Sequence, residues 1–373
     1  MNRLFSPITV GAMDLPNRIL MAPMTRARAP HDIADERTAL YYAQRATAGL
    51  IVSEGTPISN QGQGYLFNPG IFTDAQIEGW RLTTNSVHAL GGRIFAQIWH
   101  VGRVSHVSIQ KDGAAPVSAS DKLAEGAFAF GYREDGTAGM VQASRPRALE
   151  TDEITQTIED YATAAENAIR AGFDGVEIHG ANGYLVDQFI NPGVNTRSDG
   201  YAATTITSRL RFPLEIVDAV AARIGAERTA IRLSPYGQPF DMPLYDDIPE
   251  TFQTLVAALS TRRIAYIHFM DHSRSGSATV GPLDDKKMAR FDGLLATFRQ
   301  FSGATPLALA GLLTGARAEK LLQDNLIDLA AFGRPFISNP NLVMKLAQGE
   351  KLNEWDRATF YGGGNEGYLD YPA

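Results

Sequence analysis

The sequence predicts an α/β fold, a closed (β/α)8 TIM barrel with an N-terminal hairpin cap and a long insertion after the third strand. Eight short apolar runs recur with helix-length spacers, and such near-continuous apolarity is typical of parallel strands buried on both faces. An open doubly wound sheet would usually stop earlier and carry a Gly-x-Gly-x-x-Gly turn after its first strand, which this chain lacks. The predicted strands are residues 19–24, 50–54, 93–99, 175–179, 229–234, 266–270, 306–310 and 329–333.

The elements around these strands can also be predicted. Ile8 to Ile19 has the pattern of a small hairpin that turns at Gly11, and we expect it to plug the N-terminal end of the barrel. Thr151, followed by two acidic residues, begins a helix that Gly172 ends. The predicted apolar face of this helix comprises Ile154, Ile158, Tyr161, Ala165 and Ile169.

Two long loops depart from a minimal barrel. Residues Ser105 to Ala148, after the third strand, are polar and rich in Gly and Ser, and their length suggests a lid. A second long loop, Asp271 to Lys287, follows the sixth strand. We expect residues 1–373 to form a single domain, with the lid-like insertion at about 105–148.

Composition narrows the function classes. The net charge of -7 and the lack of basic runs disfavour nucleic-acid binding. The chain has no cysteine and no His-Glu-x-x-His spacing, so we expect no metal site, thiol nucleophile or disulfide. No apolar stretch is long enough for a membrane span, which suggests a cytoplasmic protein. We also expect a monomer or homodimer that acts on a small molecule.

The segment from Gly175 to Phe189 carries the strongest functional signal. His179 is expected at the C-terminal end of the fourth strand, with Asn182 and Tyr184 in the loop beyond. Catalytic groups of such barrels lie at this end of the strands. A strand-end histidine alone is more often structural, but three polar groups on one loop favour an active-site wall.

A phosphate site is indicated near the C-terminus. The seventh and eighth strands end at Gly311 and Gly333, and Arg334 precedes Pro335, which can open a short helix. In this fold a phosphate often sits on these loops, although the glycines could simply turn each strand into its helix. Arg334 would be a bidentate phosphate partner.

Other strand ends carry polar groups but no strong nucleophile. Thr25 follows the first strand, Gly55 follows the second, and Gln97 lies near the end of the third. Arg232 lies within the fifth strand. A buried arginine needs an anionic partner, either a ligand or a carboxylate such as Glu177. Phosphate binding, an inward arginine and amide donors suggest a bound cofactor, and FMN fits, with Gln97 and Thr25 on its ring.

The chain resembles the Old Yellow Enzyme family of FMN-dependent NADH:flavin oxidoreductases and ene-reductases over nearly its whole length. The motifs that carry the resemblance are Met21-Ala-Pro-Met-Thr-Arg26, Ser53-Glu-Gly-Thr56, Gln97-Ile-Trp-His-Val-Gly-Arg103, His179-Gly-Ala-Asn-Gly-Tyr184, Ala230-Ile-Arg-Leu-Ser-Pro235, Ala331-Phe-Gly-Arg334, Ser338-Asn-Pro340 and Phe360-Tyr-Gly-Gly-Gly364. This sequence has the His-x-x-Asn form of the fourth motif, where other members have His-x-x-His.

The resemblance implies a role for each matching residue. His179 and Asn182 would donate hydrogen bonds to a substrate oxygen, and Tyr184 would supply a proton. Tyr65, Trp99 and Tyr361 would form an aromatic rim that binds a flat substrate. The FMN ring and ribityl chain would contact Ala22, Pro23, Met24, Thr25, Gly55, Gln97 and Arg232, and the phosphate would contact Gly311, Gly333 and Arg334.

The predicted activity is an FMN-dependent, NADPH- or NADH-oxidising reduction of the C=C bond of α,β-unsaturated carbonyl or nitro compounds. Hydride transfer would be ping-pong, with Tyr184 as the proton donor. Three alternatives remain open at this point: a nitrate ester or nitroaromatic reductase on the same scaffold, a sugar-phosphate lyase or aldolase, and a flavin-storing or electron-passing protein. The predicted strands contain no lysine, which argues against a Schiff-base aldolase.

Overall fold

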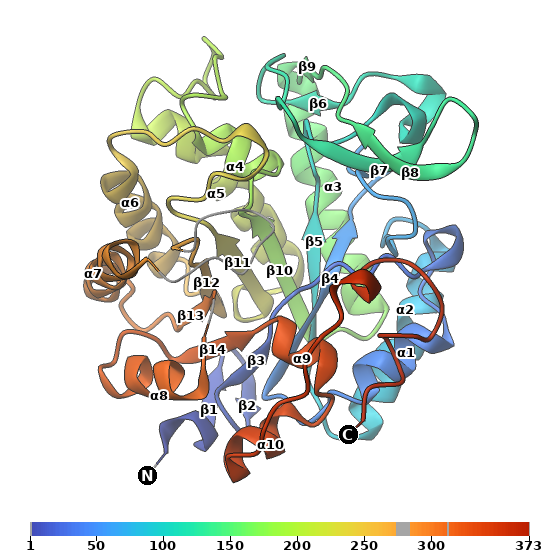
Figure 1. Ribbon diagram of the computed structural model, residues 1–373. Coiled ribbons are helices and arrows are strands. Elements are labelled where there is room, and N and C mark those ends of the chain that lie inside the picture. The colour runs from blue at the N-terminus through green and yellow to red at the C-terminus, as the bar shows by residue number, and fades with distance from the viewer. Residues whose placement is uncertain (1, 274–283, 312, 373) are drawn as a thin grey trace.

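Eight parallel strands close into a barrel in the computed structural model, which describes residues 2–273, 284–311 and 313–372 (Figure 1). This confirms the predicted fold. In order around the barrel the strands are β10 (Gly175–Gly180), β11 (Thr229–Leu233), β12 (Tyr266–Met270), β13 (Leu307–Ala310), β14 (Leu329–Phe332), β3 (Ile19–Met21), β4 (Leu50–Pro57) and β5 (Ile94–Trp99). Each predicted strand corresponds to one of these, with ends that differ by a few residues.

Helices surround the barrel on its outer face (Figure 1). The longer ones are α1 (Glu36–Ala43), α2 (Asp74–Ala89), α3 (Thr151–Arg170), α5 (Ile206–Ile224), α6 (Ile248–Thr261), α7 (Asp285–Phe301), α8 (Gly315–Gln323) and α10 (Leu342–Gln348). Two short helices, α4 (Leu185–Ile190) and α9 (Arg334–Ser338), follow β10 and β14 directly. Short 3-10 turns occur at Arg3–Phe5, Pro30–Asp32, Val107–Ile109, Lys111–Gly113, Ala226–Arg228, Pro239–Asp241 and Arg357–Thr359.

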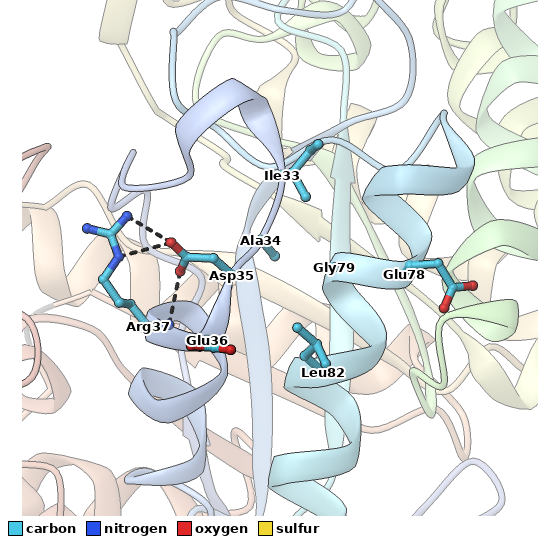
Figure 2. A pocket seen from close by; sticks show the side chains of 8 residues that line it. All are labelled: Ile33, Ala34, Asp35, Glu36, Arg37, Glu78, Gly79 and Leu82. Atoms are coloured by element: carbon cyan, nitrogen blue, oxygen red, sulfur yellow. Dashed lines mark hydrogen bonds and ion pairs between the residues drawn. The ribbon is translucent and has the colours of Figure 1, made fainter.

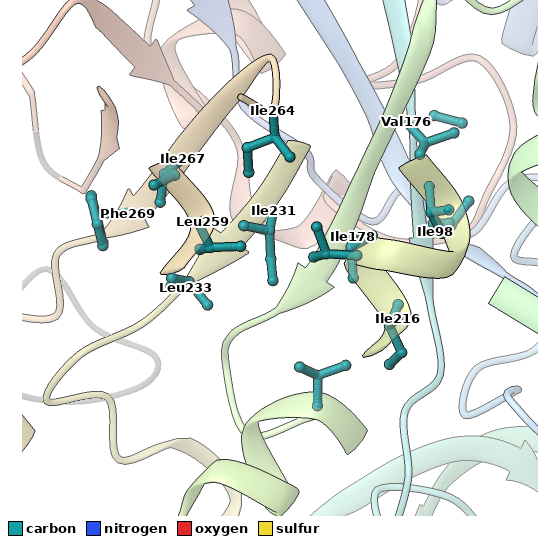
Figure 3. Packing of buried hydrophobic residues seen from close by; sticks show 14 of the residues in the cluster. Ile98, Val176, Ile178, Ile216, Ile231, Leu233, Leu259, Ile264, Ile267 and Phe269 are labelled. Atoms are coloured by element: carbon teal, nitrogen blue, oxygen red, sulfur yellow. The ribbon is translucent and has the colours of Figure 1, made fainter. Parts of the chain in front are cut away.

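Along most barrel strands the side chains alternate between two apolar clusters, as the period of a β-strand requires. Ile178 of β10 and Ile231 of β11 point outward and pack with helix residues such as Leu259 (Figure 3). Their neighbours on the opposite face, such as Ala230, belong to a separate cluster inside the barrel. The inward positions near the C-terminal strand ends are partly polar, and this is where the candidate site forms.

The predicted hairpin is confirmed as β1 (Ile8–Val10) and β2 (Met13–Leu15), which pair antiparallel. Val10 and Leu15 belong to the cluster inside the barrel, so the hairpin closes its N-terminal end. Gly11 at the turn has a φ of 56°, and a Cβ atom there would lie 2.0 Å from the Glu227 carbonyl oxygen. The turn therefore requires glycine, both for its positive φ and because a side chain would collide with Glu227.

Helix α3 begins at Thr151, as predicted, and Gly172 follows its end with a φ of 92°. The Glu153 carboxylate accepts a hydrogen bond from the Glu150 N–H, 2.8 Å away, which caps the first turn. Ile154, Tyr161 and Ala165 are buried, as expected. Ile158 and Ile169 are only half-buried, because the buried stripe passes through Ala164 and Ala168 instead.

The insertion after β5 forms its own small structure at the end of the barrel opposite the hairpin (Figure 1). It contains the antiparallel pair β7 (Phe128–Tyr132) and β8 (Ala138–Gln142), while β6 (Val117–Ser118) and β9 (Arg147–Ala148) pair at its base. Gly64 and Leu66, in the loop after β4, exchange backbone hydrogen bonds with Phe130 of β7. The insertion is thus docked beside Tyr65.

The second long loop, Asp271 to Lys287, falls largely outside the described residues; its described parts are 271–273 and the start of α7. Within the portions of the chain that are described, no helix combines the length and the apolar character that a membrane crossing requires.

Leu259 and Leu82 offer a matched test of this packing. Leu259 on α6 is fully buried against the barrel, whereas Leu82 on α2 is 48% exposed. Leu259→Ala should lower the free energy of unfolding by about 2–5 kcal/mol, because it leaves a cavity under α6. Leu82→Ala should change it by less than about 0.5 kcal/mol. Urea denaturation followed by circular dichroism measures both, and equal effects would contradict this account of the core.

Candidate active site

A layer of polar side chains lines the inside of the barrel near the C-terminal ends of its strands. His179 of β10 pairs in register with Arg232 of β11, and Arg232 pairs with His268 of β12. Glu177 lies two residues before His179, on the same face, and is in register with Gln97 of β5. All five side chains are buried.

The Glu177 carboxylate is the hub of this layer. It accepts hydrogen bonds from Gln97 Nε2 at 2.8 Å, from the Tyr266 hydroxyl at 3.0 Å and from His268 Nδ1 at 2.8 Å. Burial opposes its ionisation, but His268, Arg232 and the donated hydrogen bonds together hold the pKa of the Glu177 carboxyl below its usual value. The site therefore contains a buried carboxylate that already accepts three hydrogen bonds.

Arg232 has no such partner. Among the described residues no carboxylate oxygen lies within ion-pair distance of its guanidinium, so the alternative of a Glu177 salt bridge is wrong: Glu177 is paired with His268 instead. Arg232 Nη2 lies 3.3 Å from Met270 Sδ, and Arg232 Nε is buried without a hydrogen-bond partner. Burial lowers the pKa of Arg232, but a guanidinium remains charged at neutral pH. This cation is arranged to meet an anionic or electron-rich ligand.

The turn after β10 is held in an uncommon conformation. Asn182 and Gly183 have φ values of 58° and 76°, the left-handed region that Asn and Gly tolerate best. The Asn182 N–H donates to Ser234 Oγ at 2.7 Å, and the Gly183 N–H donates to Asp187 Oδ2 at 2.9 Å. Ser234 Oγ in turn donates to Asp187 Oδ2 at 3.2 Å. These bonds aim the Asn182 and Tyr184 side chains.

Tyr184 stands in an aromatic cage. Its ring meets Trp99 and His179 edge-on, at centroid distances of 4.9 and 5.1 Å, and its hydroxyl lies 3.1 Å from the Tyr65 hydroxyl. Burial first, and then the neighbouring Tyr65 and Tyr361, raise the pKa of Tyr184 well above its usual value. The phenol therefore keeps its proton throughout the neutral range.

His179 is a neutral imidazole. Its ring lies parallel to Trp99 at a centroid distance of 5.9 Å, and its Nδ1 is buried without a protein partner. Burial, assisted by the positive charge of Arg232, lowers the pKa of His179 well below its usual value. A neutral imidazole with an unpaired ring nitrogen can still donate one hydrogen bond to a ligand.

The predicted site residues on the first two barrel strands also lie at the C-terminal ends. Ala22 and Pro23 are buried and follow β3 directly, with Met24 and Thr25 half-buried beyond them. Glu54 of β4 anchors this loop, because its Oε2 accepts hydrogen bonds from the backbone of Arg26 and Ala27. Burial raises the pKa of Glu54 to about 7. Gly55 lies so close to Trp99 that a Cβ atom would meet the indole at 2.5 Å.

The predicted phosphate residues end two adjacent strands. Gly311 follows β13 with a φ of 118°, and Gly333 follows β14, which pairs with β13. Arg334 begins α9, and Pro335 lies in its first turn, as the sequence predicted. The Arg334 guanidinium lies 6.0 Å from the centre of the Trp355 ring. These residues are brought together, and their role toward a phosphate stays a prediction.

Tyr361 reaches the rim through the C-terminal segment. Arg26 Nε donates to the Phe360 carbonyl at 2.9 Å, and Arg28 Nη2 donates to the Thr359 carbonyl at 2.6 Å. Arg28 also bonds the Gly364 carbonyl. Tyr361 is 67% exposed, in contrast to the buried Trp99. The rim residues therefore come from three segments far apart in the sequence.

Three further residues of this region were not predicted. Phe240 packs against Tyr184 at a ring centroid distance of 5.6 Å. Ser234 holds the Asn182 backbone, and His272 Nε2 lies 3.0 Å from Asn182 Oδ1. They lie on the loops after β11 and β12. Ser234 belongs to the motif Ala230-Ile-Arg-Leu-Ser-Pro235, which gave it no role, and no motif marks Phe240 or His272. Only their position just after inward-facing strands could have suggested Phe240 and His272.

A groove on the surface lies elsewhere, between the N-terminal parts of α1 and α2 (Figure 2). Its walls include Ile33, Ala34, Gly79 and Leu82, and the ion pair of Arg37 with Asp35, 2.8 Å, borders it. It contains none of the predicted site residues. The predicted site residues lie at the strand ends and not in this groove.

Comparisons with known proteins find relatives that match nearly the whole chain. The family model described as NADH:flavin oxidoreductase / NADH oxidase matches residues 3–353. Putative 12-oxophytodienoate reductase 2 of Oryza sativa subsp. japonica is 39% identical over 373 residues, covering 99% of this chain and 93% of that protein. Flavin oxidoreductase hxnT of Emericella nidulans is 40% identical over 390 residues, covering 99% of this chain and 97% of that protein.

Solved structures are also similar to this chain. A structure of morphinone reductase in complex with tetrahydroNAD has a TM-score of 0.92 and 46% identity, covering 99% of this chain and 97% of that one. An Old Yellow Enzyme homologue from Zymomonas mobilis has a TM-score of 0.89 and 39% identity, covering 99% of both chains. Together with the polar layer around Arg232, these matches show that the chain belongs to the NADH:flavin oxidoreductase / NADH oxidase family and is an FMN-dependent, nicotinamide-oxidising enzyme of the Old Yellow Enzyme type.

Proposed function

We propose that this enzyme reduces the C=C bond of alkenes conjugated to a carbonyl or nitro group. The observation that carries the proposal is that His179, at the C-terminal end of β10, and Asn182 and Tyr184, in the turn that follows, lie beside Trp99 and Tyr65. Two donors for an oxygen and one acidic phenol are what such a substrate requires. Because the family is one of oxidoreductases, the lyase alternative is set aside.

The residues present fit FMN. The buried, unpaired guanidinium of Arg232 suits the pyrimidine edge of the ring, which becomes anionic on reduction, and Gln97 Oε1 can serve the ring because only Nε2 is used by Glu177. Ala22, Pro23, Met24, Thr25 and Gly55 would line the ring and ribityl chain, and Gly311, Gly333 and Arg334 the phosphate. The chemistry that bound FMN supplies is the acceptance of hydride from NADPH or NADH and its delivery to the alkene.

His179 and Asn182 would hold the substrate oxygen. A neutral imidazole and an amide donate hydrogen bonds without placing a full charge beside the substrate. As the β-carbon of the alkene gains hydride, negative charge moves onto the oxygen, and donors fixed in place stabilise it. Trp99 fixes the His179 ring, and Ser234 fixes the Asn182 backbone.

Tyr184 would protonate the α-carbon. Its phenol is uncharged at neutral pH, because burial and the neighbouring Tyr65 raise its pKa, and so it holds a proton that it can transfer. Tyr65, Trp99 and Tyr361 would form the aromatic rim over a flat substrate, with Phe240 closing the pocket beside Tyr184. Reductant and alkene would occupy this pocket in turn, which makes turnover ping-pong.

The direct test follows the flavin spectrum. The purified protein should be yellow, NADPH or NADH should bleach it without air, and cyclohexenone should restore the colour while cyclohexanone is formed. A colourless protein that does not take up FMN would contradict the proposal. Faster reoxidation by a nitrate ester or a nitroaromatic than by any enone would favour the alternative reductase instead.

Tyr184→Phe should separate the two half-reactions. We expect reoxidation of the reduced flavin by cyclohexenone to slow by about 10²–10⁴-fold, since the phenol proton is lost, while reduction by NADPH stays nearly unchanged. Stopped-flow absorbance measures each half. In the parent, neither Tyr184 nor His179 should impose a pH dependence on reoxidation between about pH 6 and pH 9, because burial raises the pKa of Tyr184 and lowers that of His179.

Tyr132→Phe is the matched control for this variant. Tyr132 lies on β7 and is 45% exposed, so its variant should keep both rates. Equal slowing of the two half-reactions in Tyr184→Phe would remove Tyr184 from the donor role.

Arg232→Met tests the unpaired cation. Without FMN, the variant should melt at the same temperature as the parent or higher, because an uncompensated buried charge is removed. With FMN, the rise in melting temperature should be smaller than for the parent, because the ligand loses its ionic partner. Arg228→Met, an exposed change just before the same strand, should keep the full rise. A full rise in Arg232→Met would argue against contact with the flavin.

A further inference from the structure

His272 contacts the amide of Asn182 from the far side of the site. It lies just after β12, in the loop beyond Met270, and its Nε2 is 3.0 Å from Asn182 Oδ1. The two residues are 90 positions apart in the chain. The side chain of Asn182 is therefore held at its oxygen, leaving Nδ2 for another partner.

The His272 ring is fixed in this position by the loop after β11. A Cβ atom on Gly237 would lie 3.1 Å from His272 Cδ2 and 3.2 Å from Nε2, so the ring packs directly on the Gly237 backbone. The Gly237 N–H donates to the Ser234 carbonyl at 3.0 Å, and Ser234 Oγ accepts from the Asn182 N–H. The loop after β11 thus holds the backbone N–H of Asn182, and the loop after β12 holds its side-chain oxygen.

The tautomer of His272 decides which group of the Asn182 amide is left free. Burial, together with the nearby positive charge of Arg232, lowers the pKa of His272 to about 4, so the ring is neutral at physiological pH. A neutral imidazole has one N–H, and a bond to an amide oxygen requires that this hydrogen be on Nε2. The remaining group of Asn182 is then a donor, the NH₂. The opposite orientation would offer an oxygen, which would repel the substrate oxygen.

We propose that His272 is a positioning residue for the alkene reduction: its Nε2–H holds Asn182 Oδ1, so that Asn182 Nδ2 points at the substrate carbonyl or nitro oxygen. This inference rests on the function proposed above, in which Asn182 donates a hydrogen bond to the substrate oxygen. His272 itself does not touch the reacting atoms. Its whole effect should pass through Asn182.

The experiment uses the FMN-loaded enzyme and two substitutions with opposite chemistry. His272→Phe keeps a planar ring but removes the N–H, whereas His272→Gln places an amide N–H near the position of the imidazole Nε2. The flavin is reduced with dithionite, which bypasses the nicotinamide, and reoxidation by saturating cyclohexenone is followed in a stopped-flow instrument. Binding of cyclohexanone to the oxidised enzyme is measured by calorimetry.

We expect His272→Phe to slow reoxidation by about tenfold and to weaken cyclohexanone binding, since one donor to the oxygen is no longer oriented. His272→Gln should recover most of both. In the Asn182→Ala background, His272→Phe should cause no further loss, because two residues acting through one interaction are not additive. His88→Phe, at the other end of the barrel where His88 contacts Asp174 at 2.9 Å, should keep both parent values.

The outcomes separate the two proposals. If Asn182→Ala is slow but His272→Phe is as fast as the parent, or if the two losses multiply in the double variant, the positioning role is wrong and the proposed function stands. The positioning role also fails if His272→Gln is as slow as His272→Phe, because loss of packing would then explain both. If Asn182→Ala reoxidises as fast as the parent, the donor role of Asn182 fails, and the role of His272 fails with it.

Discussion

The buried carboxylate of Glu177 is the interaction on which the rest of the site depends. It takes hydrogen bonds from β5 and β12, the neighbours of β10 and β11, and so joins Gln97, Tyr266 and His268 in one network. Glu177 pairs with His268, and no carboxylate oxygen of the described residues lies within ion-pair distance of Arg232, which is an unpaired cation in the polar layer. That charge, together with burial, keeps His179 neutral. An anionic ring bound beside Arg232 would complete the layer electrostatically.

Substrate recognition depends on loops that are tied to one another. The Arg103 guanidinium, fully buried, donates to the Lys122 and Leu123 carbonyls of the insertion and to the Phe240 and Asp241 carbonyls after β11. Arg103 therefore connects the insertion to the wall of the pocket beside Tyr184. The lid role suggested by the length of the insertion stays a prediction.

Much of the fold could be predicted because its signals are local. Buried parallel strands are apolar throughout, the Gly11 turn needs a left-handed residue, and Thr151 and Gly172 mark the ends of a helix. Exceptions arise where packing overrides periodicity: Ile158 and Ile169 are half-buried because the small residues Ala164 and Ala168 let α3 approach its neighbours more closely. The contact of Tyr65 with Tyr184 joins residues 119 positions apart, and no local pattern encodes it.

The sequence by itself determined the barrel, the position of His179, Asn182 and Tyr184 after the fourth strand, and the family, since these rest on strand periodicity and on motifs within short segments. Only the tertiary structure decided which groups pair. In the closed barrel Glu177 pairs with His268 and not with Arg232, and His272 contacts Asn182. The physical reason is that hydrogen bonding and burial are set by distances between strand-end loops, and those distances exist only after the barrel has closed.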